Sequence, residues 1–112
     1  MINVTIYKNH NNDIVGFETE GHAGYDDSGK DIVCAAVSML VINTVNSIEA
    51  FTDTDIEVNS NNDNDNDNAR ISARITGHQS GEAAVLLKSL ELGLTQVAKG
   101  NPKYISITFK EV

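Results

Sequence analysis

Polar and apolar residues alternate in five segments of the chain, and this pattern predicts five β-strands. In the first, residues 2–8, the side chains of Ile2, Val4 and Ile6 point to one face and polar side chains point to the other. The remaining strands are expected over 14–21, from 55–58 onward, over 69–77 and over 103–112.

Local signals add detail around these strands. Residues 9–13, NHNND, are typical of a hairpin turn, because Asn and Asp side chains bond to nearby backbone and tolerate positive φ. Gly16 interrupts the second strand and indicates a bulge or a weak point.

Residues 59–68 contain only Asn, Asp and Ser, which predicts a disordered, solvated hairpin tip. An EF-hand loop in this run would need a glycine and a glutamate where Asn68 and Arg74 stand, so weak calcium binding is only an alternative and no metal site is predicted.

Two longer segments have helical spacing. Over 32–51 an apolar stripe recurs every three or four residues, and apolar residues on the remaining face predict a central, well-buried helix with Asp31 as its N-cap. A strand over 39–45 is the alternative, because several residues there are β-branched, but the length of the segment favours a helix. The second helix is expected from about Gly81 to Lys99, with Gly100 as C-cap. The two stripes are Val33, Val37, Val41, Thr44, Ile48 and Phe51, and Ala83, Leu87, Leu90, Leu94 and Val97.

The expected order of elements is therefore ββαββαβ. This order predicts a single two-layer α+β domain over residues 1–112, with both helices packed on one face of a mostly antiparallel sheet of about five strands.

Composition narrows the class of protein. The net charge of −8 argues against a nucleic-acid partner, since phosphates would be repelled. No apolar run reaches the roughly 18 residues of a membrane span, and no secretory signal is visible, so we expect a soluble cytoplasmic protein. The charge is uneven, with a net of −11 over residues 1–68 and +3 over residues 69–112. This asymmetry either attracts a basic partner or only keeps the surface solvated.

The chain has one cysteine, Cys34, and His22 lies twelve residues before it across the loop 23–30. If Asp31 caps the helix, Cys34 lies in its first turn, where unpaired N–H groups stabilise a thiolate. An imidazole within reach of the sulfur would act as general base and acid, and Asp31 would either orient it or cap the helix. Glycines in the loop would let it move as a lid.

A single cysteine is also often only a small apolar core residue. His10 and His78 are expected on the exposed surface.

The residues GHA at 21–23 and DIVCAAVS at 31–38 closely resemble the ribosomal-processing cysteine protease (Prp) family. The resemblance implies a Cys–His dyad of Cys34 and His22, with Asp31 beside them. It also implies a homodimer that removes the N-terminal extension of the precursor of large-subunit ribosomal protein twenty-seven, without a cofactor. Candidates for substrate contact lie in these stretches or directly after the first one: Gly21, Ala23, Gly24, Tyr25 and Ser38. We further expect Glu18, Glu20, Asp26 and Asp27 to attract lysines of the substrate.

Two other classes of function stay open. The chain is alternatively a non-catalytic ribosome-assembly or adaptor module with Cys34 in its core, or another thiol hydrolase acting on a small substrate. Cleavage of a precursor protein at one defined bond would separate the first hypothesis from both.

Overall fold

The fold was analysed in a computed structural model that describes residues 1–21, 28–61 and 70–112, without the side chains of residues 28–31 and 61. The order of elements is ββαββαβ, which confirms the prediction. The elements are β1 (Ile2–Lys8), β2 (Ile14–Glu20), α1 (Ser28–Phe51), β3 (Ile56–Asn61), β4 (Arg70–Ile75), α2 (Gly81–Gly100) and β5 (Ile105–Glu111).

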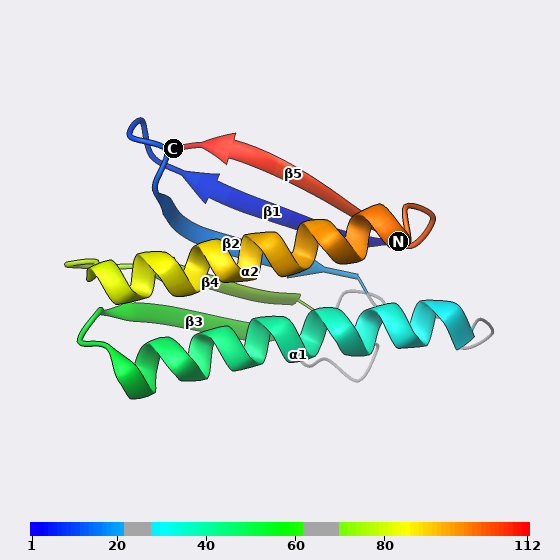
Figure 1. The fold of residues 1–112 in the computed structure, drawn as a ribbon, viewed down its shortest axis with the longest axis horizontal. Coiled ribbons are helices and arrows are strands. Elements are labelled where there is room, and N and C mark those ends of the chain that lie inside the picture. Colours follow the sequence, from blue (N-terminus) through cyan, green and yellow to red (C-terminus); the bar gives the residue numbers. More distant parts are fainter. Residues whose placement is uncertain (22–27, 62–69) are drawn as a thin grey trace.

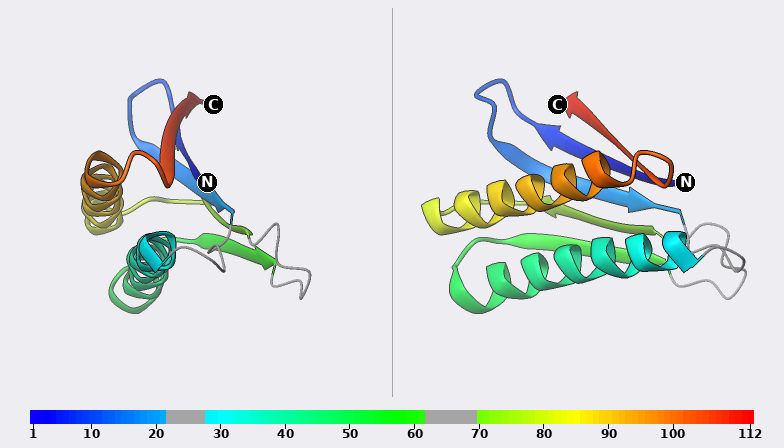
Figure 2. Two further views of the ribbon diagram at one scale, coloured as in Figure 1. Left: turned by 90° about the vertical axis from the view of Figure 1, so that its right-hand side faces the viewer. Right: turned by 45° about the vertical axis from the view of Figure 1, so that its right-hand side comes forward.

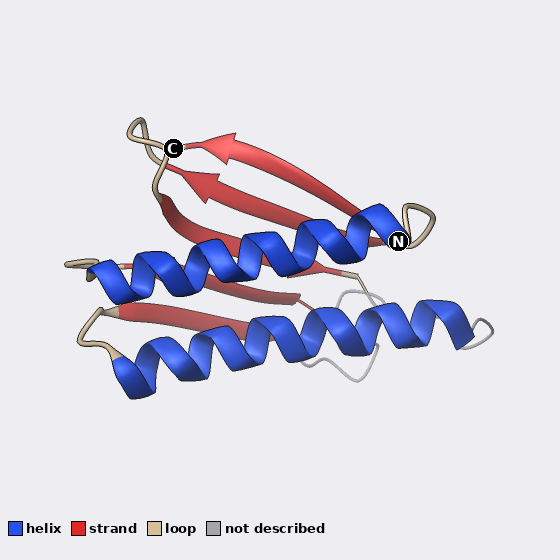
Figure 3. Cartoon of the chain, viewed as in Figure 1, coloured by secondary structure: helices blue, strands red, loops and turns tan. Residues whose placement is uncertain are grey.

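The strands form one sheet in the order β3-β4-β2-β1-β5 (Figure 1). All neighbouring pairs are antiparallel except β1 and β5, which run parallel because α2 lies between β4 and β5 in the chain. Both helices lie side by side in a second layer on one face of the sheet, as the end-on view in Figure 2 shows. The colouring by secondary structure in Figure 3 separates the same two layers. The predicted two-layer α+β fold is therefore confirmed.

The two faces of the sheet differ sharply in chemistry. The face toward the helices carries buried apolar side chains, with Ile6, Phe17 and Ala73 in one cross-strand row. The opposite face, called here the open face, carries polar and charged side chains: Asn3, Thr5, Tyr7, Glu18, Glu20, Glu57, Asn59, Arg70, Ser72, Arg74, Ser106, Thr108 and Lys110. Period-two alternation therefore places the core on one side only.

Helix α1 is less buried than the sequence suggests. The predicted stripe is buried from Val33 to Ile48, which also rules out a strand over 39–45. However, Phe51 is 76% exposed and Ile32 is 70% exposed, so the expectation of a well-buried helix was wrong. Over residues 32–51 this helix is long and apolar enough to cross a membrane by length and composition alone, contrary to expectation. Its stripe nevertheless packs in the core that the sheet and α2 share.

The ends of the helices also correct the sequence analysis. Helix α1 begins at Ser28, so Asp31 lies within its first turn and is not the N-cap. Helix α2 begins after Ser80, whose Oγ accepts a hydrogen bond from the backbone N–H of Ala83 at 3.1 Å. Its C-cap is Asn101 and not Gly100, because the Asn101 side-chain amide donates to the carbonyl oxygen of Val97 and its backbone N–H closes the last turn.

The loop and bulge predictions are mostly confirmed. The Oδ1 of Asn9 accepts backbone hydrogen bonds within the 9–13 turn, and Asn12 has a φ of 69°. The register between β1 and β2 slips next to Gly16, which is the predicted bulge. The third strand continues to Asn61, so residues 59–61 belong to the sheet, and residues 62–68 of the expected tip lie outside the described residues.

Candidate active site

Cys34 is the seventh residue of α1 and lies in its second turn. The expectation that it lies in the first turn was wrong, because the helix begins earlier than Asp31. Only the first four N–H groups of a helix lack partners within it, and the favourable charge of a helix end falls off within one turn. The helix end therefore contributes less to a thiolate at Cys34 than the sequence suggested, and a neighbouring base matters more.

The side chain of Cys34 is half-buried and packs against the core from one flank of α1. The other flank faces α2, since Leu40 fills the space beside Gly93, where an added Cβ would lie 3.1 Å from the Leu40 side chain. Six residues separate Cys34 from Leu40, which places the two about 120° apart around the helix axis. Cys34 therefore lies on the flank that faces away from α2, toward β3, where α1 contacts the sheet.

Ser38 lies one turn after Cys34 on the same flank, at the i, i+4 spacing at which helical side chains are neighbours. Its side chain is exposed. The structure thus brings the nucleophile candidate and one predicted substrate contact together on an accessible surface.

Gly21 directly follows β2 and is held under a clear backbone constraint. Its φ is +123°, a conformation that residues with a Cβ rarely adopt. An added Cβ would also lie 2.6 Å from the carbonyl oxygen of Met1. Both features require glycine at this position and determine the direction in which the chain leaves the sheet toward His22.

Several of the other predicted site residues lie outside the part of the chain that the structure describes. His22, Ala23, Gly24 and Tyr25 lie outside the described residues, and for Asp31 only the helical backbone is described. The pairing of His22 with Cys34 stays a prediction. Figure 1 shows that the end of β2 and the start of α1 lie toward the same end of the molecule. The other two histidines, His10 and His78, are exposed, as expected.

Two of the acidic residues expected to attract a basic substrate have another role. The side chain of Arg70 donates to Glu20 at 2.6 Å and lies 3.8 Å from Glu18. The hydrogen bond to Glu20 and the charge of Glu18 raise the pKa of Arg70 above its ordinary value. Both carboxylates lie on the open face, so their charge is partly neutralised away from Cys34. The other two, Asp26 and Asp27, lie outside the described residues.

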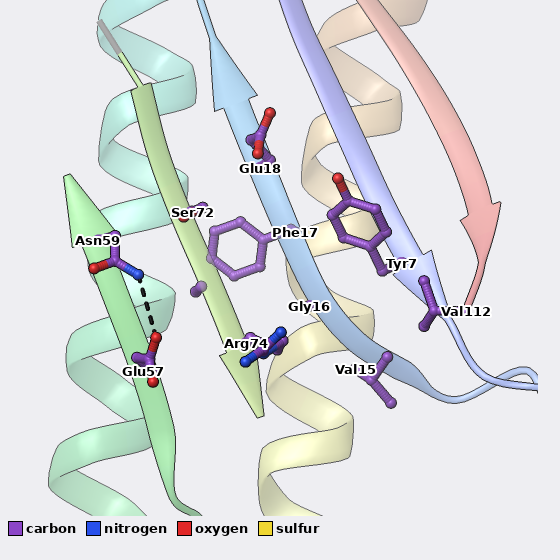
Figure 4. Close-up of a pocket in the computed structure, with 11 residues that line it drawn as sticks. Tyr7, Val15, Gly16, Phe17, Glu18, Glu57, Asn59, Ser72, Arg74 and Val112 are labelled. Atoms are coloured by element: carbon purple, nitrogen blue, oxygen red, sulfur yellow. Dashed lines mark hydrogen bonds between the residues drawn. The ribbon is translucent and has the colours of Figure 1, made fainter. Parts of the chain in front are cut away.

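A hollow of about 470 Å³ lies on the open face, where Tyr7, Glu18, Ser72 and Arg74 border it around Gly16 (Figure 4). Gly16 has no side chain to fill this space, and a Cβ at this position would lie 2.8 Å from the carbonyl oxygen of Ala73. The helices lie behind the sheet in this view, and Cys34 belongs to helix α1. The hollow is therefore separate from the candidate active site.

Sequence reasoning missed Arg70 as the partner of these acids. The signal existed, because Arg70 stands directly opposite Glu20 in the β2–β4 ladder. This pairing can be inferred only when the register of the two strands is known, because 50 residues separate Arg70 from Glu20 in the chain.

Comparisons with known proteins identify the family of this chain. The family model described as cysteine protease Prp matches residues 1–106. The ribosomal processing cysteine protease Prp of Bacillus subtilis (strain 168) is 42% identical over 48 residues, a match that spans 43% of this chain and 43% of that protein's length.

Solved structures extend the similarity to the whole fold. The crystal structure of SMU.848 from Streptococcus mutans has a TM-score of 0.88 at 25% identity and covers 100% of this chain and 96% of that chain. The ribosomal processing protease Prp from S. aureus, solved with a covalently linked product peptide, has a TM-score of 0.82 at 26% identity. That comparison covers 98% of this chain and 100% of the other. The same S. aureus protease was also solved with a substrate peptide, with a TM-score of 0.80 at 25% identity over 98% of this chain and 100% of that one. From the match over residues 1–106, the chain belongs to the cysteine protease Prp family.

Proposed function

We propose that this chain is a cysteine endopeptidase that cleaves a ribosomal protein precursor, with Cys34 as its nucleophile. The observation that carries the proposal is that the sequence contains one cysteine, so a cysteine protease of this family has one possible nucleophile here. That cysteine lies half-buried on the flank of α1 that α2 leaves uncovered. A cysteine that serves only as a small apolar core residue would not need to lie at this partly exposed position.

The reaction proceeds through a thioester. His22 accepts the proton of the Cys34 thiol, and the sulfur attacks the carbonyl carbon of the scissile peptide bond. The C–N bond then breaks, and His22 returns the proton to the leaving amine. A water molecule, deprotonated by the same imidazole, then attacks the thioester carbonyl carbon, and the C–S bond breaks. The N-terminal fragment leaves as a carboxylic acid, and the imidazolium returns its proton to the sulfur of Cys34. His22 follows Gly21 directly in the sequence, so we expect the backbone conformation of Gly21 to set the position of the imidazole.

The substrate proposal follows from the family and from its relatives in Bacillus subtilis and S. aureus, which are named ribosomal processing proteases. We take the substrate to be the precursor of large-subunit ribosomal protein twenty-seven, cut after a short N-terminal extension. We also propose that the protein acts in the cytoplasm as a homodimer, and that Asp31 orients the imidazole of His22 from the first turn of α1.

Incubation of the protein with this precursor, followed by intact-mass spectrometry, tests the proposal. Two fragments that meet at one defined bond are expected, and Cys34→Ala should give neither. An uncut precursor with the wild-type protein would favour an adaptor. Cleavage of small amides but not of the precursor would indicate a different thiol hydrolase.

A further inference from the structure

The sheet has two edges, and they differ in where they lie relative to Cys34. The strand order makes β3 and β5 the outer strands of the described sheet. Helix α1 contacts β3, whereas α2 contacts β2 and β5. Cys34 lies on the flank of α1 that faces away from α2, so β3 is the edge on its side.

Backbone geometry shows which groups of β3 point outward. The N–H of Thr76 donates to the carbonyl oxygen of Asp55 at 3.0 Å, and the register continues with Ile56 opposite Ile75. Hydrogen-bonded and non-hydrogen-bonded pairs alternate in an antiparallel ladder. The residues that bond to β4 are therefore Asp55, Glu57 and Asn59, and those with outward N–H and C=O groups are Ile56, Val58 and Ser60.

This edge lacks the features that usually block strand addition. The sequence of β3 is IEVNSN, with no Lys or Pro, and its pairing with β4 is regular over all six residues. Two apolar side chains on this side of the molecule are exposed: Val58 of β3 by 38%, and Ile42 of α1 by 50%. Ile42 lies about 160° around the helix from Leu40, on the side away from α2.

We infer that the peptide substrate binds as an added strand on the outer edge of β3 and continues past its end to Cys34. This inference deepens the proposed function and rests on it. An extended peptide supplies its own N–H and C=O groups to the outward groups of Val58 and its alternate neighbours. Alternate apolar side chains of the peptide would contact Val58 and Ile42.

The geometry also sets how far the paired segment lies from the scissile bond. From Phe51 back to Cys34, α1 rises about 26 Å, whereas β3 spans about 17 Å. The two elements start from the same short connection, so Cys34 lies about 9 Å beyond the end of β3. An extended chain covers this distance with about three residues.

Proline substitution tests the edge with a matched control. Val58→Pro removes an outward N–H and leaves the β3–β4 ladder intact. Phe109→Pro removes an outward N–H on the opposite edge and leaves the β1–β5 ladder intact. Alternate residues of β5 bond to β1, as Tyr104 and Val112 do, so the N–H of Phe109 points outward. We expect Val58→Pro to raise KM for the precursor peptide about five- to tenfold with kcat nearly unchanged, the loss of one hydrogen bond. Phe109→Pro should leave KM within about twofold, and unfolding curves of both variants check that the fold survives.

Amide exchange gives a readout that needs no cleavage. The Cys34→Ala variant should bind the intact peptide, and the amides of Val58 and Ser60 should then exchange more slowly in NMR spectra. The amides of Ile107 and Phe109 should not change. Val58 and Ser60 amides that stay unchanged while the peptide binds would overturn the inference and leave the proposed function intact. If the wild-type protein neither cleaves nor binds the peptide, the proposed function fails and this inference fails with it.

Discussion

The carbonyl oxygen of Met1 lies 2.6 Å from the position that a Cβ on Gly21 would occupy. The substitution Gly21→Ala forces this contact and a φ of +123° on a residue that has a Cβ. We expect it to destabilise the fold by about 1–2 kcal/mol, the usual penalty for that backbone region. It should also lower the cleavage rate at least about tenfold, because His22 is the next residue and a small displacement of a catalytic group is costly.

Gly100→Ala is the matched control for this change. An added Cβ at Gly100 meets no atom within 4 Å, and this residue ends a helix. Urea unfolding and cleavage assays should both show little change. Equal effects of the two substitutions would mean that the turn at Gly21 has no special role.

Replacement of the three histidines in turn tests the general base. The change His22→Ala should lower kcat/KM by about 10²–10⁴, the usual contribution of a positioned proton-transfer group. His10→Ala and His78→Ala should have near wild-type rates, since both side chains are exposed and lie in connections between elements, outside the helices and strands. A large loss in either of these variants, with His22→Ala active, would reassign the base.

The ion pairs of Arg70 change the expectation for salt dependence. The double variant Glu18→Gln, Glu20→Gln should alter substrate capture by less than about twofold, because Arg70 already offsets these charges on the open face. Asp26→Asn with Asp27→Asn should instead flatten the decline of kcat/KM with salt, if the acidic loop attracts the substrate. Capture that depends on Glu18 and Glu20 would show that the substrate crosses the open face.

The orientation of α1 can be tested by two truncations of the same predicted stripe. Ile48 is fully buried, so Ile48→Ala should lower the free energy of unfolding by about 2–5 kcal/mol. Phe51→Ala should lower it by less than about 1 kcal/mol, because the ring is mostly exposed. Chemical denaturation of both variants measures the difference. A large loss at Phe51 would mean that another surface covers this ring in solution.

These two residues also show how far periodicity predicts burial. The spacing from Val33 to Ile48 predicts the buried face of α1 correctly, since a helix turns by a constant angle per residue. Whether the last member of the stripe is covered depends on where the sheet ends. That is a tertiary property, and the repeat does not encode it.

The start of α1 was misplaced for a different reason. Residues 28–31, SGKD, carry a glycine and no apolar residue, so they are typical of a loop. Packing of the later turns on the sheet stabilises the helix as a whole, so its first turn can form without an apolar stripe of its own. The site residues Cys34 and Gly21 were therefore identifiable from their motifs, whereas their distances from the helix end and from Met1 required the fold.

The most direct test of the account is to find the covalent intermediate on Cys34. The wild-type protein is mixed with the precursor peptide, quenched in acid within the first turnover and digested for mass spectrometry. We predict that the fragment containing Cys34 gains the mass of the N-terminal cleavage product less one water, as a thioester requires. The same mass on another residue, or cleavage that persists in Cys34→Ala, would contradict the central claim.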